Sequence, residues 1–370
     1  MGELESQARI LKDWAIHAAL PFWAKTGIDK RGGFYEELDL DGRPNVNAIR
    51  RVRVQARQIY VYAQATHLGW YDGQSLANVT FDFMCEIGHE INGERGFIHR
   101  IKPNYSPQDI KRDFYDHAFY LLGCASLLKL GPHPKPLEIL QNIATLLESW
   151  ESPHGGWVEG SPARLPRRQN PHMHFLEASM ALYAATGHSH HLENARKVID
   201  LFDRKFFDPK HHIIREFFTD DWQYMDGPIG ETSEPGHAAE WVWLLSEYQK
   251  LSDQDMSAFI SALYDSLKQP GIFLNDEEDI YGTIRRGTKR LWVQTELVKA
   301  HIAQIERGYA PARSDALRAI KALKDTYLND NGTWVDQIDP QGQACAVTIP
   351  TSTFYHIFCM IAELCRVLDI

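Results

Sequence analysis

The sequence predicts an all-α protein, an (α/α)6 barrel of six helical hairpins with short β segments at one mouth. Short Gly/aromatic segments of strand-like composition recur near Gly33, Gly96, Gly156, Ile214, Gly282 and Gly332. Two stretches with apolar residues at three- and four-residue steps lie between successive markers. Six helical pairs arranged in a ring can bury apolar stripes that no pair could bury alone. Residues 1–370 are therefore predicted to form a single catalytic domain.

The helices are predicted in pairs, for example 74–92 with 113–129 and 190–206 with 234–250. Breakers such as GPHPKP at 131–136 separate successive helices. The second helix of each pair is richer in apolar and aromatic residues, as in HFLEASMALYAA and EWVWLLSEY. These second helices are predicted to form the inner ring of the barrel.

Composition excludes several classes of function. Hydrophobic residues make up 44% and charged residues 24% of the chain, as in ordinary soluble proteins. The net charge is -10 and basic clusters are short, so no nucleic-acid partner is expected. No apolar run reaches the ~18 residues that span a bilayer, and the amino terminus does not resemble a secretory signal, so a cytoplasmic protein without a membrane partner is predicted. The five cysteines lack CxxC spacing and suit a reducing compartment. The sequence leaves a homodimer open.

Polar residues at the starts of the predicted inner helices should converge at one mouth of the barrel. The His-x-x-Glu spacing occurs twice and places both members of each pair on one helix face. Read in order, these residues are Arg53, Arg57, Tyr115, Asp116, His117, Asn170, His172, His174, Glu177, Glu234, His237, Glu240, Trp292, Glu296 and His356.

A single histidine in such a position is usually a hydrogen-bonded core residue. Burying the whole set without partners would cost several kcal/mol for each charged group, so the set predicts a wet cavity. Imidazoles can move protons beside a carbonyl carbon, carboxylates can orient them and bind hydroxyl groups, and tryptophan faces suit sugar rings. A metal site held by histidines and glutamates is the competing interpretation, although HExxH and cysteine clusters are missing from the sequence. G-x-S-x-G, Rossmann and P-loop motifs are missing too. A proton-transfer enzyme without metal or cofactor is predicted.

Four segments resemble the N-acylglucosamine 2-epimerase superfamily, most closely its D-mannose isomerase branch. They are RQNPHMHFLEA, EPGHAAEWVWLL, RLWVQTE and PTSTFYH, in this order over nearly the whole chain. The resemblance implies an (α/α)6 barrel and an enzyme that moves a proton next to a sugar's carbonyl carbon. It also implies His237 and His356 as the catalytic residues. Substrate-binding residues are expected to be Arg57, Tyr115, Asn170, His174, Glu240, Trp292, Glu296 and Phe354, where Phe354 replaces a tryptophan of several relatives.

The expected reaction interconverts D-mannose and D-fructose through a cis-enediolate. His356 is expected to act at C2 while His237 assists ring opening and proton movement between oxygens, although the two roles could be exchanged. Alternatives are a 2-epimerase of the cellobiose, N-acylglucosamine or mannose/glucose type, or an isomerase of a phosphorylated or sulfonated hexose. The basic residues that could bind such a hexose are Arg285, Arg286, Lys289 and Arg290, with Arg164, Arg167 and Arg168. A carbohydrate-binding barrel without catalysis, and a glycoside hydrolase using Glu240 and Glu296, also stay open.

Overall fold

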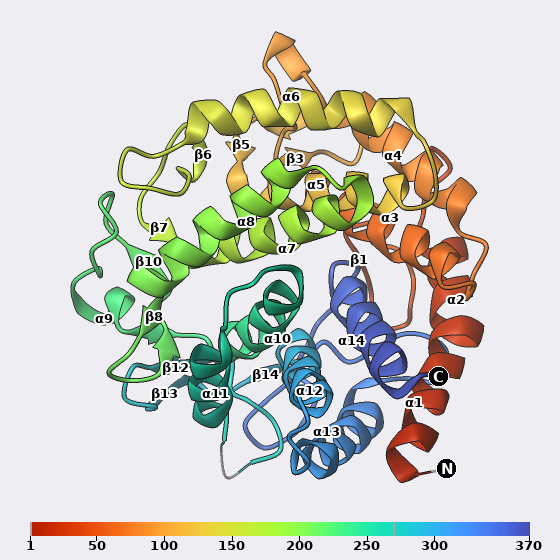
Figure 1. The fold of residues 1–370 in the computed structure, drawn as a ribbon. Coiled ribbons are helices and arrows are strands. Elements are labelled where there is room, and N and C mark those ends of the chain that lie inside the picture. Colours follow the sequence, from red (N-terminus) through yellow and green to blue (C-terminus); the bar gives the residue numbers. More distant parts are fainter. Residues whose placement is uncertain (1, 269–270) are drawn as a thin grey trace.

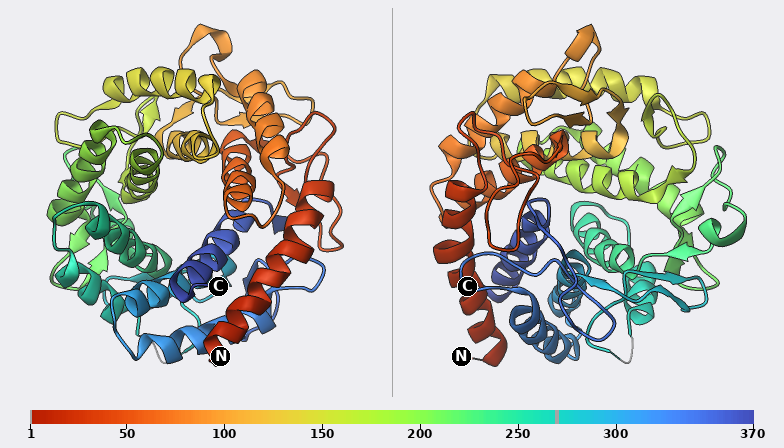
Figure 2. Two further views of the ribbon diagram at one scale, coloured as in Figure 1. Left: turned by 45° about the vertical axis from the view of Figure 1, so that its right-hand side comes forward. Right: turned by 180° about the vertical axis from the view of Figure 1, so that it is seen from behind.

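The computed structural model describes residues 2–268 and 271–370, and their helices form two concentric rings (Figure 1, Figure 2). The inner ring consists of α3 (Val52–His67), α5 (Phe114–Leu128), α7 (Gln169–Thr186), α10 (Pro235–Leu251), α12 (Leu291–Glu306) and α14 (Thr353–Leu368). The predicted (α/α)6 barrel is confirmed, and the second helix of each pair is the inner one, as predicted.

The outer helices bury one face only. In α13, Ala316, Ile320, Leu323 and Tyr327 are buried at three- and four-residue steps, the pattern of a helix that packs on a core. The helix predicted over 74–92 ends at Gly88, and the one predicted over 190–206 continues through a π-helical turn. The outer elements are α1 (Glu3–Trp14), a π-helical turn (Ala15–Ala19), α2 (Leu20–Thr26), α4 (Gln74–Gly88), α6 (Pro134–Trp150), α8 (Ser189–Leu201) with its π-helical turn (Phe202–Phe206), α11 (Ser257–Ser266) and α13 (Ala312–Tyr327).

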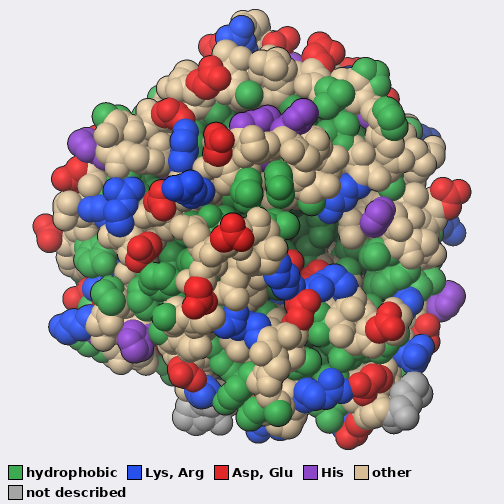
Figure 3. Space-filling model, in the orientation of Figure 1, with side chains coloured by type: hydrophobic (Ala, Val, Ile, Leu, Met, Phe, Trp, Pro, Cys, Tyr) green, Lys and Arg blue, Asp and Glu red, His purple; other side chains and the backbone are tan. Residues whose placement is uncertain are grey.

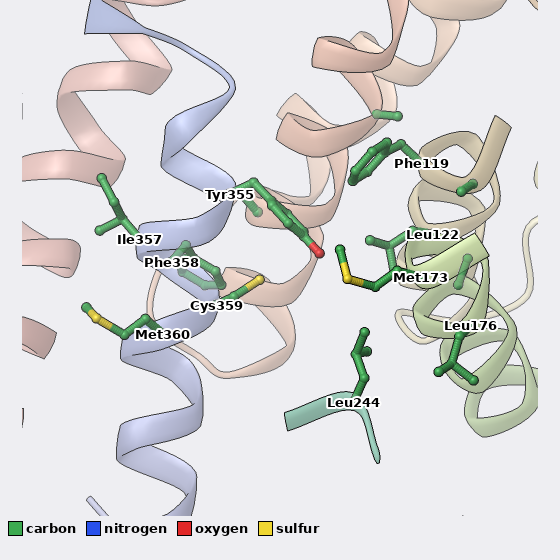
Figure 4. Packing of buried hydrophobic residues seen from close by; sticks show 14 of the residues in the cluster. Phe119, Leu122, Met173, Leu176, Leu244, Tyr355, Ile357, Phe358, Cys359 and Met360 are labelled. Atoms are coloured by element: carbon green, nitrogen blue, oxygen red, sulfur yellow. The ribbon is translucent and has the colours of Figure 1, made fainter. Parts of the chain in front are cut away.

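The hydrophobic core lies between the rings and along the barrel axis. Figure 4 shows Tyr355 on α14 and Met173 on α7 pointing toward one another, with Phe119 nearby and Leu244 reaching in from α10. These side chains are buried, and full burial of a large apolar side chain stabilises the fold by roughly 1.5–3 kcal/mol.

Short antiparallel strands tie each helical pair to the next. In each linkage, a strand just before an inner helix pairs with a strand that follows an outer helix. The linked strands are β2 (Arg50–Arg51), β3 (Arg100–Ile101) and β4 (Pro107–Asp109); β5 (Arg112–Asp113) and β6 (Gly160–Ser161); β7 (Arg167–Arg168) and β10 (Phe217–Phe218); β11 (Thr232–Ser233), β12 (Glu277–Asp279) and β13 (Ile284–Arg286); β14 (Lys289–Arg290) and β15 (Gln337–Ile338); and β16 (Ile349–Pro350) and β1 (Glu37–Leu38).

The pairing of β16 with β1 closes the ring, because it joins the last pair of helices to the first. A separate pair, β8 (Phe207–Asp208) with β9 (Ile213–Ile214), follows the turn after α8. The remaining short elements are a 3-10 turn (Ile91–Gly93) and α9 (Gly227–Gly230). One strand of each linkage leads directly into the amino-terminal end of an inner helix, and these ends therefore share one mouth.

One predicted repeat marker is wrong. Gly282 lies in the turn between β12 and β13, an extra hairpin whose Gly/aromatic composition imitates the repeat. The equivalent turn of this unit contains Leu274, whose N–H donates to Oε1 of Gln294 at 2.9 Å. In the first unit the N–H of Phe34 donates to Oε1 of Gln55 at 2.7 Å in the same way.

Among the described residues, no helix has the length and apolar character needed to cross a membrane. Figure 3 shows side chains of both charges mixed over the face seen there, rather than one broad surface of a single sign.

Candidate active site

The first turns of the inner helices surround a cavity of about 360 Å³. Every residue predicted to be catalytic or substrate-binding, except Glu296 and Phe354, belongs to its lining. The residues that line it are Arg51, Arg57, Tyr115, Asn170, His174, Glu234, His237, Glu240, Arg290, Trp292, Asp336, Pro350, Ser352, Thr353 and His356. The structure thus brings together residues that lie up to about 300 positions apart in the sequence.

Helix geometry decides which polar residues face the cavity. Residues two positions apart on a helix point about 200° away from one another. In α7, His172 points outward, and its Nε2 accepts a hydrogen bond from the N–H of Trp157 at 3.0 Å. His174, two residues later, faces the cavity. In α3 the same alternation holds: Oε1 of Gln55 accepts from the N–H of Phe34, whereas Arg57, two residues later, faces the cavity.

His117 and His172 are therefore structural residues, and their predicted place at the mouth is wrong. Nε2 of His117 accepts from the N–H of Phe97 at 3.1 Å, and its Nδ1 lies 2.8 Å from the carbonyl oxygen of Asp113. Burial lowers the pKa of His117 to about 4 and that of His172 to about 3. Gly96 has φ +78°, and a Cβ there would lie 2.5 Å from Nε2 of His117, so this glycine marker is needed to admit the imidazole.

His237 is held by a carboxylate from outside its own helix. Its Nδ1 lies 3.0 Å from both carboxylate oxygens of Glu216, and its Nε2 lies 3.0 Å from Nδ2 of Asn170. Burial lowers the pKa of His237, but the carboxylates of Glu216 and Glu234 outweigh it and raise the pKa to about 10. Burial also raises the pKa of Glu216, so the two groups share a proton and titrate as a pair. His237 can act as an acid near neutral pH.

The pKa of His356 is shifted in the opposite direction from that of His237. Its Nδ1 lies 2.8 Å from Oε1 of Glu296, which leaves Nε2 as the nitrogen available to the cavity. Burial lowers its pKa to about 4, and the guanidinium of Arg57 acts in the same direction. Glu296 is fully buried beneath the cavity and contacts His356 rather than lining the wall. His356 is therefore a neutral base at physiological pH.

Trp292 lies between these two histidines. The centroid of its ring is 5.4 Å from that of His237 and 5.6 Å from that of His356. The indole thus provides a flat surface beside both imidazoles, where a sugar ring could pack.

Arg57 reaches the cavity from α3. Its Nη2 donates to the hydroxyl of Tyr115 at 3.0 Å and its Nη1 to the carbonyl oxygen of Ser352 at 3.2 Å. Its Nε is buried without a hydrogen-bond partner among the described residues. The guanidinium therefore has a fixed position and a remaining capacity to stabilise negative charge.

A second carboxylate group surrounds His174. Nδ1 of His174 lies 3.2 Å from Oε2 of Glu177 and 3.7 Å from Oε1 of Glu240. Oε1 of Glu177 also accepts a hydrogen bond from the hydroxyl of Tyr355. Neither oxygen of Glu240 has a hydrogen-bond partner among the described residues, and burial together with the Glu296 carboxylate raises its pKa well above the usual range. Glu240 is thus available to hydrogen-bond a ligand.

Three further predicted residues lie outside the cavity. Phe354 is fully buried and stacks on Trp23 and Trp334, with centroids 6.0 and 5.9 Å away. Arg53 and Asp116 form a buried ion pair of 2.6 Å, to which His99 adds a contact between its Nδ1 and the carboxylate. The structure places these three predicted residues in the packing around the mouth.

Several lining residues were not predicted. Arg51 forms an ion pair with Glu36, and Asp336 accepts a hydrogen bond from Thr353 at 2.6 Å. Burial raises the pKa of the Asp336 carboxyl. Glu216, between the strands β9 and β10, was missed because an acidic residue in a short loop carries no periodic signal.

Among the described residues, three groups of side chains have donor atoms close enough to hold a metal ion. Within each group these atoms lie within 4.8 Å of one another. The nitrogen Nδ1 of each histidine already faces a carboxylate in the same group, so the donors can satisfy one another as hydrogen-bonded pairs. The metal-free character of the site stays a prediction. The groups are His174, Glu177 and Glu240; Glu216, Glu234 and His237; and Glu240, Glu296 and His356.

Comparison with known proteins places this chain among sugar isomerases and epimerases. Residues 33–360 match the sequence profile of a family described as N-acylglucosamine 2-epimerase (GlcNAc 2-epimerase). The chain is 33% identical over 384 residues to a protein of Rhizobium meliloti (strain 1021) named mannose-6-phosphate isomerase, covering 98% of this chain and 97% of that protein. It is 32% identical over 153 residues to a D-mannose isomerase of Thermobifida fusca, over 37% of each chain. The structure of cellobiose 2-epimerase from Bacillus thermoamylovorans B4167 superposes with a TM-score of 0.89 at 19% identity, covering 99% of this chain and 100% of that one.

Proposed function

Because the chain belongs to the N-acylglucosamine 2-epimerase family, and so to the sugar isomerases and epimerases, we propose that it is an aldose–ketose isomerase that interconverts D-mannose and D-fructose. The observation that carries this proposal is that two histidines in one cavity have pKa values shifted in opposite directions. Environments that drive the pKa values of two titratable groups apart separate an acid from a base. Here His237 is the acid and His356 the base.

In this reaction, His356 removes the proton from C2 through Nε2 and returns it to C1. Arg57 lies beside the cavity and stabilises the negative charge that develops on the enediolate oxygen. His237 donates a proton during ring opening and moves protons between O1 and O2. Glu240 and His174 hold the hydroxyl groups, and the sugar packs on Trp292.

The contacts of His237 bear on the choice between isomerisation and 2-epimerisation. A 2-epimerase returns the proton to the opposite face of C2, so it needs a second group that can reach the carbon. Nδ1 of His237 lies 3.0 Å from Glu216, and its Nε2 lies 3.0 Å from the amide of Asn170. In the proposed isomerase, Nε2 exchanges the contact with Asn170 for a sugar oxygen, and His356 alone moves the proton between the two carbons.

The ion pairs around the mouth favour a neutral sugar over a phosphorylated one. Arg290 pairs with Glu234 at 3.2 Å, Arg285 with Glu231 at 3.0 Å, and Arg286 with Glu277 at 3.4 Å. A cation that is already neutralised attracts a phosphate weakly, and Glu234 would repel it. We therefore propose D-mannose as the substrate, although a relative is named for its phosphate ester.

The test is a comparison of kcat/KM for D-mannose and for mannose 6-phosphate at equal ionic strength, with cellobiose and N-acetylglucosamine as further substrates. The proposal expects D-mannose to exceed the phosphate ester by at least about tenfold, a discrimination that one unfavourable polar contact can supply. Preference for the phosphate would overturn the choice of a neutral hexose.

A further inference from the structure

Lys299 is a buried ammonium group directly beneath the cavity. It lies on α12, three residues after Glu296, and its side chain is 1% exposed. Its Nζ is 2.9 Å from Oε2 of Glu296 and 3.6 Å from the centroid of the Trp243 ring. The contact with Glu296 is an ion pair without hydrogen-bond geometry, and Nζ has no hydrogen-bond acceptor among the described residues. The charge is therefore compensated mainly by Glu296 and the indole face.

Burying an ammonium is costly, since desolvation penalises each buried ion by several kcal/mol. A buried apolar residue of similar volume would often stabilise a fold as well or better. The presence of a lysine at this place points to a role in the site rather than in packing.

The two oxygens of Glu296 divide their contacts. Oε1 faces Nδ1 of His356 at 2.8 Å, and Oε2 faces Nζ of Lys299 at 2.9 Å. The three groups form a chain in which the carboxylate lies between the imidazole and the ammonium. A carboxylate that accepts the Nδ1 proton fixes the imidazole tautomer in which Nε2 is free.

Other charged and titratable groups face this chain. Glu240 on α10 and Glu177 on α7 bring further carboxylates, Cys359 on α14 brings a thiol, and Arg57 on α3 brings a second cation near His356. Carboxylates this close to one another favour the neutral form of at least one of them. Without Lys299, Glu296 would compete with Glu240 and Glu177 for a proton.

We propose that Lys299 is a positioning residue for the reaction: its ammonium keeps Glu296 ionised, and Glu296 in turn holds His356 with Nε2 free to act as the base. This inference rests on the proposed function for the role of His356 as the base. The contacts among Lys299, Glu296 and His356 exist without substrate. Consistent with it, burial raises the pKa of Glu296 but the Lys299 ammonium and His356 outweigh burial and lower the pKa to about 2.

The variant Lys299→Gln removes the charge and keeps an N–H donor for Glu296. The pKa of Glu296 is read from the Cδ resonance of its carboxyl group by NMR titration, with the signal identified by its loss in Glu296→Gln. Loss of the neighbouring cation should raise that pKa by about 1–3 units. The 15N resonances of the His356 ring should show Nε2 as the unprotonated nitrogen only while Glu296 is ionised. Lys299→Arg keeps the charge and is the matched control with a smaller shift. An unchanged Glu296 pKa in folded Lys299→Gln would overturn the proposal.

A measurement on the unaltered protein keeps the proposal testable if Lys299→Gln does not fold. The Cδ resonance of Glu296 should stay at the position of an ionised carboxylate from pH 8 to about pH 5, since its pKa lies near 2. Protonation of Glu296 within this range would contradict the role of Lys299. Both NMR measurements need no substrate, so their outcome is separate from any failure of the proposed isomerase activity.

Discussion

Nδ1 of His237 lies 3.0 Å from both carboxylate oxygens of Glu216, a residue outside the inner helices. Glu216 is 3% exposed and also accepts a hydrogen bond from Nε2 of Gln169 at 2.9 Å. A buried carboxylate held in this way fixes both the orientation and the charge of the imidazole, so it extends the site beyond the residues that contact a sugar.

Replacing Glu216 by glutamine should weaken the acid role of His237. Without this carboxylate, burial is opposed mainly by Glu234, so the pKa of His237 falls below its value of about 10. We expect kcat/KM at neutral pH to fall by about 10–100-fold, as for other partners that orient a functional side chain. The measurement is a pH profile of kcat/KM. A Glu216→Gln enzyme with the wild-type profile would show that His237 needs no partner.

The pairing of His237 with Glu216 should make the free energy of unfolding fall at alkaline pH. The pKa of His237 is about 10 in the folded protein and 6.5 as an ordinary histidine. The stabilisation is fully present below pH 6.5 and is lost as the pH rises from 6.5 to 10, because the folded state holds a proton that the unfolded state releases. Urea denaturation at pH 7 and pH 10 should show this decline, and the decline should be smaller in Glu216→Gln.

His356→Gln and His172→Gln form a matched pair that separates chemistry from folding. Loss of a general base typically lowers the rate by about 10²–10⁴-fold, so His356→Gln should lose activity while it stays folded. His172→Gln should retain most of kcat, because Gln55 and Gln294 make the same backbone contact in two other units. We expect His172→Gln to lower the free energy of unfolding by about 1 kcal/mol, the usual worth of one hydrogen bond. Near-normal turnover in folded His356→Gln would contradict the assignment of the base.

Acid should destabilise the protein through its buried neutral histidines. Burial lowers the pKa of His117, His174 and His356 to about 4 and that of His172 to about 3. Their contribution to stability is present above pH 6.5 and is lost as the pH falls from 6.5 toward 4, because the unfolded chain binds protons that the folded protein excludes. At pH 5, unfolding should take up roughly three to four protons from these residues, measured by the pH dependence of urea-unfolding free energies. Constant stability between pH 6.5 and pH 5 would contradict their burial as neutral groups.

Chelation should leave the activity unchanged. The groups around His174, His237 and His356 have their donor atoms paired with one another, so the proposed mechanism needs no ion. The measurement is turnover of D-mannose after extensive treatment with EDTA, with the chelator removed before the assay. Loss of activity that Mn²⁺ or Zn²⁺ restores would replace the proton-transfer account with a metal-assisted one.

The ring of helices and most of the cavity could be predicted because both depend on periodic features. Arg57, His174 and His237 lie at the starts of strongly apolar helices, and the repeat brings such starts together. The direction in which one side chain points depends on the helix register, which composition does not give. His172 and His174 look equivalent in the sequence, yet one contacts the Trp157 backbone and the other faces the cavity.

Glu216 and Lys299 could not be predicted for different reasons. Glu216 lies in a short loop whose position depends on the pairing of β10 with β7. Lys299 lies in an inner helix where a charged residue normally marks an exposed face, and only the packed structure shows that it is buried against Glu296 and Trp243. Phe354 was assigned to the site by analogy with a tryptophan of relatives, whereas its contacts with Trp23 and Trp334 belong to the core.

The most direct test of the central claim follows the transferred hydrogen. EDTA-treated protein is incubated with D-mannose in D2O, and the products are read by NMR. The account predicts fructose that carries either deuterium at C1 or the hydrogen that began at C2, because one base serves both carbons. An epimerised aldose with deuterium at C2 and no fructose would contradict the isomerase, and no conversion of D-mannose would contradict the proposed reaction of His237 and His356.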